Sequence, residues 1–191
     1  MTSAQQYESI DGVVVRPLTP HRDSRGAFTE IYRESWELGC WPVQFNGVTS
    51  AAGVLRGMHV HIQHVDHLAV VAGTMLLALH DVRPWSRTAG TSCLIEIGAN
   101  APRAVVIPTG VAHGFYFPEP SVLVYGVSAY WDSNDEVACR WDSAELGLSW
   151  PTTAPILSER DAQAPDYAAF RATFLQSWRR MHGALPERCA S

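Results

Sequence analysis

Residues 53–73 read Gly53-Val54-Leu55-Arg56-Gly57-Met58-His59-Val60-His61-Ile62-Gln63-His64-Val65-Asp66-His67-Leu68-Ala69-Val70-Val71-Ala72-Gly73. Four of the chain's 8 histidines lie here, inside an otherwise apolar stretch bounded by glycines. On an extended strand, side chains two positions apart share a face, so we expect His59 and His61 to point the same way. Paired imidazoles next to Arg56 indicate a metal site, a base with its neighbour or an anion site; the alternative is a pair of ordinary strand histidines.

The segments around this stretch predict an all-β fold. Short apolar or alternating runs occur at 13–15, 43–50, 68–71, 75–79, 93–97, 104–107 and 122–131, with Gly and Pro between them. Strands spaced by about 8–12 residues are typical of a β-sandwich or a jelly-roll barrel. On the strand at 43–50, Gln44 and Asn46 share one face, and two amides on one face suggest a polar cavity. Asp23-Ser24-Arg25-Gly26 reads as a turn that leads into another strand.

One helix is expected, at the C-terminal end of the chain. Phe170, Phe174, Trp178 and Met181 recur at helical spacing, and Gly183 follows as a stop. We expect this apolar stripe to pack the helix against the outside of the barrel.

Composition limits the class of protein. With 191 residues and 47% hydrophobic side chains, the chain can form one core, so we expect a single domain over 1–191. A net charge of −5 disfavours nucleic acid as a partner. No apolar run approaches the roughly 18 residues of a membrane span, so no membrane partner is expected. The 4 cysteines are far apart in sequence, which favours a reducing, cytoplasmic location.

Six further patterns, taken together, resemble the dTDP-4-dehydrorhamnose 3,5-epimerase family, which are cupin-fold enzymes acting on nucleotide-linked 4-keto-6-deoxyhexoses. They are Asp23-x-Arg25-Gly26-x-Phe28-x-Glu30, Gly53-Val54-Leu55-Arg56-Gly57-Met58-His59, Asp81-Val82-Arg83, Ile107-Pro108-x-Gly110-x-Ala112-His113-Gly114-Phe115, Trp141-x4-Leu146-x3-Trp150-Pro151 and Leu157-Ser158-x-Arg160-Asp161-x3-Pro165. Each pattern alone is weak, but six in the same order cover nearly the whole chain.

The resemblance implies a catalytic set. His59 matches the general base, Asp161 the carboxylate that orients it, and Tyr125 the tyrosine that returns a proton from the opposite face. His113 matches the histidine near the keto oxygen of the sugar, and His67 falls at a lysine that helps to hold the oxyanion. This last difference puts rate, substrate and regiochemistry in question. The family also has a Tyr-Gln or similar pair after the base, where this chain has Val60-His61.

The resemblance also implies a substrate-binding set and an assembly. The expected substrate-binding residues are Arg25, Phe28, Glu30, Gln44, Asn46, Arg56, Tyr130 and Arg160. Among these, Arg25 reaches in from the partner subunit of a homodimer, and Tyr130 stacks on the nucleobase. Strand parity places Tyr125 and Tyr130 on opposite faces unless a bulge intervenes. The implied substrate is a dTDP-linked 4-keto-6-deoxy sugar, epimerised at C3, C5 or both, without a cofactor or metal.

Two other functions remain open at this stage. The spacing of His59, His61, Asp66 and His113 approximates the metal motif of cupin oxygenases and isomerases, although Asp stands where Glu is usual. A 3,4-ketoisomerase acting on a sugar nucleotide would also suit the motifs.

Overall fold

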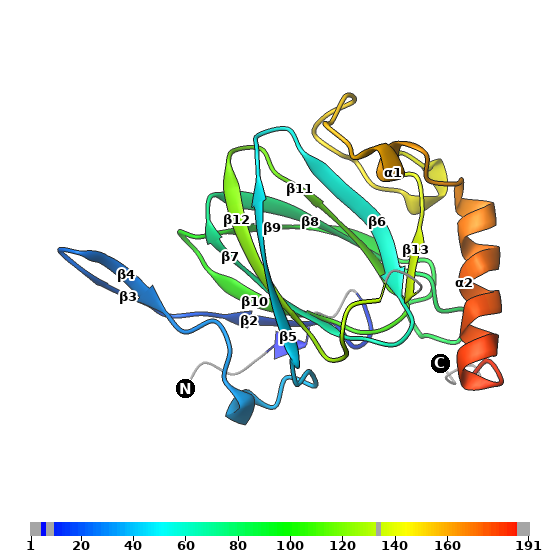
Figure 1. Cartoon of the computed structure of the whole chain (residues 1–191), viewed down its shortest axis with the longest axis horizontal. Helices are drawn as coiled ribbons and strands as arrows, with labels where there is room; N and C mark the ends of the chain where they lie inside the picture. The colour runs from blue at the N-terminus through cyan, green and yellow to red at the C-terminus, as the bar shows by residue number, and fades with distance from the viewer. Residues whose placement is uncertain (1–4, 7–9, 133–134, 187–191) are drawn as a thin grey trace.

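The computed structural model describes residues 5–6, 10–132 and 135–186, which form two antiparallel sheets facing each other (Figure 1). The first sheet has the strand order β1-β2-β10-β7-β12-β5 and the second β13-β6-β11-β8-β9. The strands of the first sheet are β1 (Gln5–Gln6), β2 (Val14–Pro17), β10 (Arg103–Ile107), β7 (Asp66–Ala72), β12 (Ser121–Val127) and β5 (Gln44–Ser50). Those of the second are β13 (Glu136–Ala138), β6 (Leu55–His61), β11 (Val111–Tyr116), β8 (Thr74–Asp81) and β9 (Ser92–Gly98). The all-β prediction is therefore confirmed.

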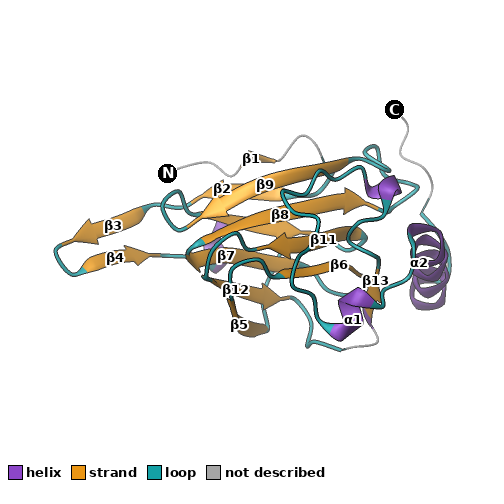
Figure 2. Ribbon diagram, turned by 90° about the horizontal axis from the view of Figure 1, so that it is seen from above, coloured by secondary structure: helices purple, strands orange, loops and turns teal. Residues whose placement is uncertain are grey.

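A hairpin of β3 (Pro20–Asp23) and β4 (Gly26–Thr29) forms a separate two-stranded sheet that projects away from the barrel (Figures 1 and 2). The predicted turn lies at its tip, where Gly26 adopts a φ of 135° that other residues rarely adopt. Short 3₁₀ turns occur at Glu34–Trp36 and Ala144–Leu146.

The apolar core between the two sheets explains why the strands alternate. Leu68 and Val70 of β7 meet Leu77 and Leu79 of β8 there, all nearly inaccessible to solvent. By the same alternation, Met58 and Val60 of β6 lie on the outer face of the second sheet, beneath the C-terminal helix. His59 and His61 lie on its inner face. A side-chain period of two therefore places the histidines inside the barrel.

The predicted C-terminal helix is α2 (Tyr167–His182), which covers the outer face of the second sheet (Figure 1). It begins at Asp166, whose carboxylate accepts a hydrogen bond from the Ala169 amide at 2.9 Å, and ends before Gly183. Phe170, Phe174 and Trp178 are buried as expected, whereas Met181 is exposed. A short helix, α1 (Glu159–Ala162), precedes it.

No helix among the described residues is both long enough and apolar enough to cross a membrane. Likewise, no disulfide joins the cysteines that the structure describes, Cys40, Cys93 and Cys139. Cys189 lies outside the described residues.

Candidate active site

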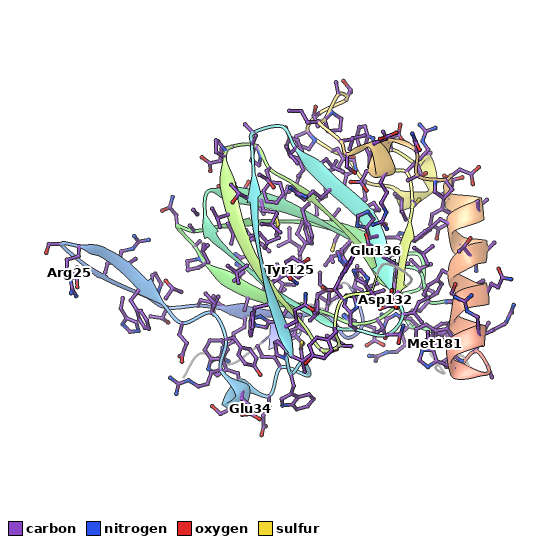
Figure 3. The ribbon with its side chains drawn as sticks, viewed as in Figure 1. Arg25, Glu34, Tyr125, Asp132, Glu136 and Met181 are labelled. Atoms are coloured by element: carbon purple, nitrogen blue, oxygen red, sulfur yellow. The ribbon has the colours of Figure 1, made fainter. Side chains whose placement is uncertain are left out.

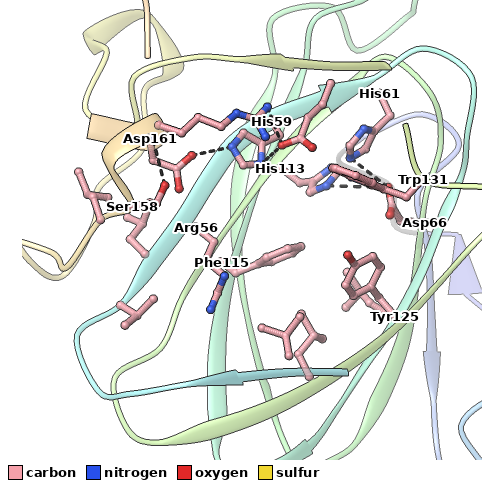
Figure 4. Close-up of a pocket in the computed structure, with 18 of the residues that line it drawn as sticks. Arg56, His59, His61, Asp66, His113, Phe115, Tyr125, Trp131, Ser158 and Asp161 are labelled. Carbon is pink, nitrogen blue, oxygen red and sulfur yellow. Dashed lines mark hydrogen bonds and ion pairs between the residues drawn. The ribbon is translucent and has the colours of Figure 1, made fainter. Parts of the chain in front are cut away.

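A cavity of about 460 Å³ opens between the two sheets, within the range of small-molecule sites (Figure 4). Strands β5, β6, β7, β11, β12 and β13 contribute to its wall, together with the segment around α1. Apolar side chains such as Val48, Leu68 and Leu123 line part of it. Its polar and titratable lining residues are Arg56, His59, His61, His64, Asp66, His113, Tyr125, Glu136, Ser158, Arg160 and Asp161.

His59 is held between two carboxylates in this wall. Its Nε2 lies 2.7 Å from an Asp161 oxygen and its Nδ1 lies 2.9 Å from a Glu136 oxygen. The position of Asp161 is fixed by the start of α1, because the Ser158 hydroxyl caps that helix and accepts a hydrogen bond from the Asp161 amide. Arg160 pairs in turn with Glu136 at 2.9 Å. The four side chains form one charged network on the cavity wall.

This network controls the protonation of His59. Burial on its own would lower the pKa of the imidazole, but the hydrogen bonds and negative charges of Asp161 and Glu136 outweigh burial and raise it to about 9. The pKa of Asp161 is lowered although burial opposes this, because His59 donates to it. In this arrangement His59 is protonated at neutral pH.

Tyr125 and Arg56 complete the predicted lining. Figure 4 shows the Tyr125 side chain across the cavity from His59, with Arg56 also directed inward. Burial raises the pKa of Tyr125, so its phenol is a neutral hydrogen-bond donor at pH 7. The Arg56 guanidinium bonds to the Ser50 hydroxyl at 3.1 Å and to the Thr49 carbonyl at 3.4 Å. The cavity therefore has a histidine–carboxylate pair on one side and a phenol on the other.

A second polar group, formed by His61, His64, Asp66 and His113, lies next to the His59 network. All four side chains are buried, and the three histidines surround the carboxylate of Asp66. Burial raises the pKa of Asp66 to about 7 and lowers that of His113 to about 4. Burial also lowers the pKa of His61, well below its ordinary value. Nitrogen and oxygen atoms of His61, Asp66 and His113 lie close enough together to hold a metal ion.

The structure does not place His67 in this cavity. On β7, Asp66 and Leu68 face the interior, so His67 points to the other side of the sheet. There it packs edge-on against Tyr32, with ring centroids 5.3 Å apart, and burial lowers its pKa to about 4. A neutral imidazole on the opposite face cannot hold an oxyanion, which corrects the sequence-based role.

Three predicted substrate-binding residues, Arg25, Phe28 and Glu30, lie on or beside the projecting hairpin and not in the cavity wall of their own chain. Arg25 occupies the tip, with its side chain 88% exposed and paired to Asp23 (Figure 3). Phe28 is 70% exposed, and Glu30 pairs with Arg33.

Gln44 and Asn46 extend the cavity-facing side of β5 beyond Val48, outside the lining itself. The two amides bond to each other at 2.8 Å, and the Gln44 oxygen accepts a hydrogen bond from the Trp131 amide. Tyr130 is 77% exposed and lies outside the cavity, in the segment after β12, while its neighbour Trp131 lines the cavity. The aromatic residue of this segment in the wall is thus Trp131.

Sequence reasoning missed Glu136. It belongs to β13, a three-residue strand whose pairing with β6 places Glu136 opposite His61 and Ala138 opposite His59. Nothing in the spacing of Glu136 along the chain indicates that its carboxylate reaches His59, because that contact depends on this long-range pairing.

Comparison with known proteins places the fold and the cavity among sugar-nucleotide epimerases. The model of the family described as dTDP-4-dehydrorhamnose 3,5-epimerase matches residues 7–169. The dTDP-4-dehydrorhamnose 3,5-epimerase of Pseudomonas aeruginosa is 36% identical over 155 residues, covering 76% of this chain and 86% of its own.

Two solved structures show the same likeness. The Legionella pneumophila 3,5-epimerase RmlC, in complex with dTDP-4-keto-L-rhamnose, superposes with a TM-score of 0.84 at 25% identity and full coverage of both chains. The 3'-monoepimerase ChmJ of Streptomyces bikiniensis, in complex with dTDP-quinovose, gives 0.80 at 29% identity, covering 93% of this chain and 96% of its own. The chain belongs to the dTDP-4-dehydrorhamnose 3,5-epimerase family, and is an isomerase-class enzyme.

Proposed function

We propose that this enzyme inverts C3, C5 or both in a dTDP-linked 4-keto-6-deoxyhexose, with His59 as the base. The observation that carries the proposal is the His59–Asp161 pair, at 2.7 Å, facing Tyr125 across the cavity. Both carbons flank the C4 ketone, so removal of either C–H proton gives an enolate. Inversion then needs a base on one face and an acid on the other, which are the two groups found on opposite sides of the cavity.

Each residue has a distinct task in this scheme. Neutral His59 accepts the carbon-bound proton, which contributes on the order of 10²–10⁴-fold to the rate. Asp161 holds the imidazole in orientation and stabilises its positive charge. Tyr125 donates a proton to the opposite face of the enolate. The resemblance puts His113 near the C4 oxygen, where stabilisation of the developing negative charge contributes roughly 10²–10³-fold.

The protonation state of His59 sets the pH range. A base must be neutral to accept a proton, and the neutral fraction of His59 rises as the pH approaches its pKa of about 9. Exchange of the sugar proton is therefore expected to rise from pH 7 to pH 9. Movement of Glu136 away from His59 when substrate binds would lower this pKa and extend activity toward neutral pH.

The substrate carries a nucleoside diphosphate. The complexes with dTDP-4-keto-L-rhamnose and dTDP-quinovose support dTDP as the nucleotide. In the wall, Arg160 is already paired with Glu136, whereas Arg56 has no carboxylate partner among the described residues. Arginine forks match phosphate oxygens, so Arg56 contacts the diphosphate in this proposal.

A homodimer supplies the second arginine. Arg25 lies at the exposed tip of the projecting hairpin, away from the cavity of its own chain. A projecting hairpin of this shape suits insertion into the cavity of a partner subunit. In this proposal the enzyme is cytoplasmic, a location that the wide spacing of the 4 cysteines along the chain favours.

The direct test is incubation of the protein with a dTDP-4-keto-6-deoxyhexose in D₂O, followed by NMR. Deuterium is expected at C3, C5 or both, together with inverted product. A carbonyl that moves from C4 to C3 would identify a 3,4-ketoisomerase instead. No deuterium uptake between pH 7 and pH 9 would contradict the proposal.

Subunit complementation tests the arm. Inactive Arg25→Ala and His59→Ala proteins, unfolded and refolded together, form mixed dimers in which one cavity is wild type in both residues if Arg25 acts in the partner. Recovery of about a quarter of the wild-type rate is expected from random pairing. If Arg25 acts in its own chain, mixing restores nothing.

A further inference from the structure

Three imidazoles surround one buried carboxylate beside the His59 network. The Nε2 atoms of His61 and His113 lie 3.9 and 3.8 Å from the same oxygen of Asp66, and the Nε2 of His64 lies 3.8 Å from its other oxygen. These distances are too long for hydrogen bonds, because a nitrogen and an oxygen about 3.6 Å or more apart are not hydrogen-bonded. Figure 4 shows His61 and His113 both directed at Asp66. The groups converge without bonding to one another.

His61 lacks any hydrogen-bond partner within the described part of the chain. Its side chain is only 10% exposed, its Nδ1 is fully buried without a partner, and its Nε2 faces Asp66 at 3.9 Å. An unsatisfied buried polar group destabilises the fold. A buried group of this kind points to a partner that is not a protein side chain, such as a bound ion or an ordered water.

The other two histidines are oriented as metal ligands are. The Nδ1 of His113 bonds to the Val111 carbonyl at 3.3 Å, and the Nδ1 of His64 bonds to Asp135 at 2.9 Å. A histidine that donates its Nδ1 proton to an oxygen keeps a lone pair on Nε2, and metal-bound histidines are held in this way. Both Nε2 atoms face Asp66, that of His113 toward one carboxylate oxygen and that of His64 toward the other.

We propose that His61, Asp66 and His113 bind a divalent transition-metal ion, with His64 as the nearest additional donor. One ligand atom from each of the three lies within 4.8 Å of the others. Ligand atoms about 2.0–2.1 Å from a tetrahedral zinc ion are about 3.3 Å apart. The observed separations of 3.8 and 3.9 Å would therefore shorten by about half an ångström when the ion binds. Two imidazoles and a carboxylate suit zinc, iron, nickel or manganese, and leave coordination positions open.

The open positions face the cavity, because all three residues line it. A consequence for the reaction rests on the proposed function. His113 is the residue expected near the C4 oxygen, so an ion bound there would polarise that carbonyl as a Lewis acid. The family resemblance implied no metal, whereas the spacing of His59, His61, Asp66 and His113 left a metal site open. The structure gathers the last three of these residues and pairs His59 with Asp161 instead.

Metal binding is tested without any sugar nucleotide, so the result does not depend on whether the protein is an epimerase. Untagged protein is dialysed against chelator and titrated calorimetrically with ZnSO₄ and then with CoCl₂. One ion per chain is expected, with a Kd of about 1 μM or tighter, together with a rise in Tm. A wild-type protein that binds none of Zn²⁺, Co²⁺, Fe²⁺, Mn²⁺ or Ni²⁺ overturns the proposal.

Variants locate the ion. His61→Ala and the isosteric Asp66→Asn are expected to weaken binding at least about 100-fold. The matched control is His21→Ala, a histidine of the projecting hairpin, which should bind as wild type does. Unweakened binding in both cluster variants would place the ion elsewhere and contradict the assignment.

A spectroscopic measurement covers the case in which these variants do not fold. Electron paramagnetic resonance of the Cu²⁺-loaded wild-type protein should show coupling to at least two imidazole nitrogens, and its absence would contradict the site. For the Lewis-acid role, a deuterium-exchange rate that falls at least about tenfold on chelation and returns with the metal would support it. An unchanged rate in metal-free, active enzyme would rule it out.

Discussion

His59 and His61 share one face of β6, two residues apart, and yet their environments are opposite. Both imidazoles are largely buried, and burial alone would lower the pKa of each. His59 has carboxylate oxygens at 2.7 and 2.9 Å, and its pKa rises to about 9. The carboxylate nearest to His61 is 3.9 Å away, and the pKa of His61 stays well below its ordinary value. Contact with a carboxylate, and not burial, decides which histidine is charged.

The difference divides the cavity into two regions. At the His59 end, the proton acceptor is His59 itself, and its pKa depends on the positions of the Glu136 and Asp161 carboxylates. At the His61 end, three imidazoles converge on the carboxylate of Asp66 and are suited to coordinate an ion. Three changes test this division, beginning with the largest expected effect.

Removal of the base should have the largest effect. His59→Ala is expected to slow uptake of solvent deuterium by the 4-keto sugar on the order of 10²–10⁴-fold, because no other group replaces the proton acceptor. Exchange is followed by NMR at pH 8, with His182→Ala as a control that removes a histidine at the end of α2, outside the cavity. Exchange at the wild-type rate in His59→Ala would exclude His59 from the mechanism.

Removing one of the two carboxylates that contact His59 should bring its pKa closer to that of His61. Glu136→Gln removes one negative charge at 2.9 Å, so the pKa of His59 is expected to fall from about 9 by about 1–2 units. Because a neutral imidazole is the active form, exchange at pH 7 should rise about tenfold, provided that proton abstraction limits the rate.

The pKa itself is measured by NMR titration of the histidine ring signals. Glu96→Gln on β9 removes an equal charge from an exposed position and serves as the matched control. A pKa of His59 that is the same in Glu136→Gln and in wild type would show that Glu136 does not charge the base.

The smallest effect is expected at His67, which lies on the far side of β7. His67→Gln should change the exchange rate by less than about twofold and leave its dependence on pH unchanged, because the side chain is outside the cavity. A changed pH dependence would restore the role that the sequence suggested for His67. Thermal unfolding of the variant reports the loss of the contact with Tyr32 separately.

Much of the site follows from local sequence. The alternation of β6 predicts that His59 and His61 share a face, and the Ser158-capped start of α1 carries Asp161 in a recognisable pattern. His113, Tyr125, Arg56 and Arg160 also line the cavity in the structure, as their positions in the family motifs implied. Such residues were predictable because each depends on strand parity or on a short motif.

Other placements were not predictable because they depend on which strands pair. Asp66 and His67 are adjacent, so only one of them can face the interior, but the choice is made by the register of β7 against β10 and β12. Tyr130 and Trp131 present the same ambiguity in a segment after β12.

The all-β barrel, the strand with the paired histidines, the C-terminal helix and the family could all be predicted from the sequence. Side-chain period and turn residues act over a few positions, so local patterns record them. Three placements appear only in the folded chain: Glu136 in contact with His59, Asp66 among three imidazoles, and Arg25 on a hairpin away from the cavity of its own chain. Each of them depends on contacts between residues that are distant in sequence. Pairing energies summed over whole strands set them, and no local pattern records that sum.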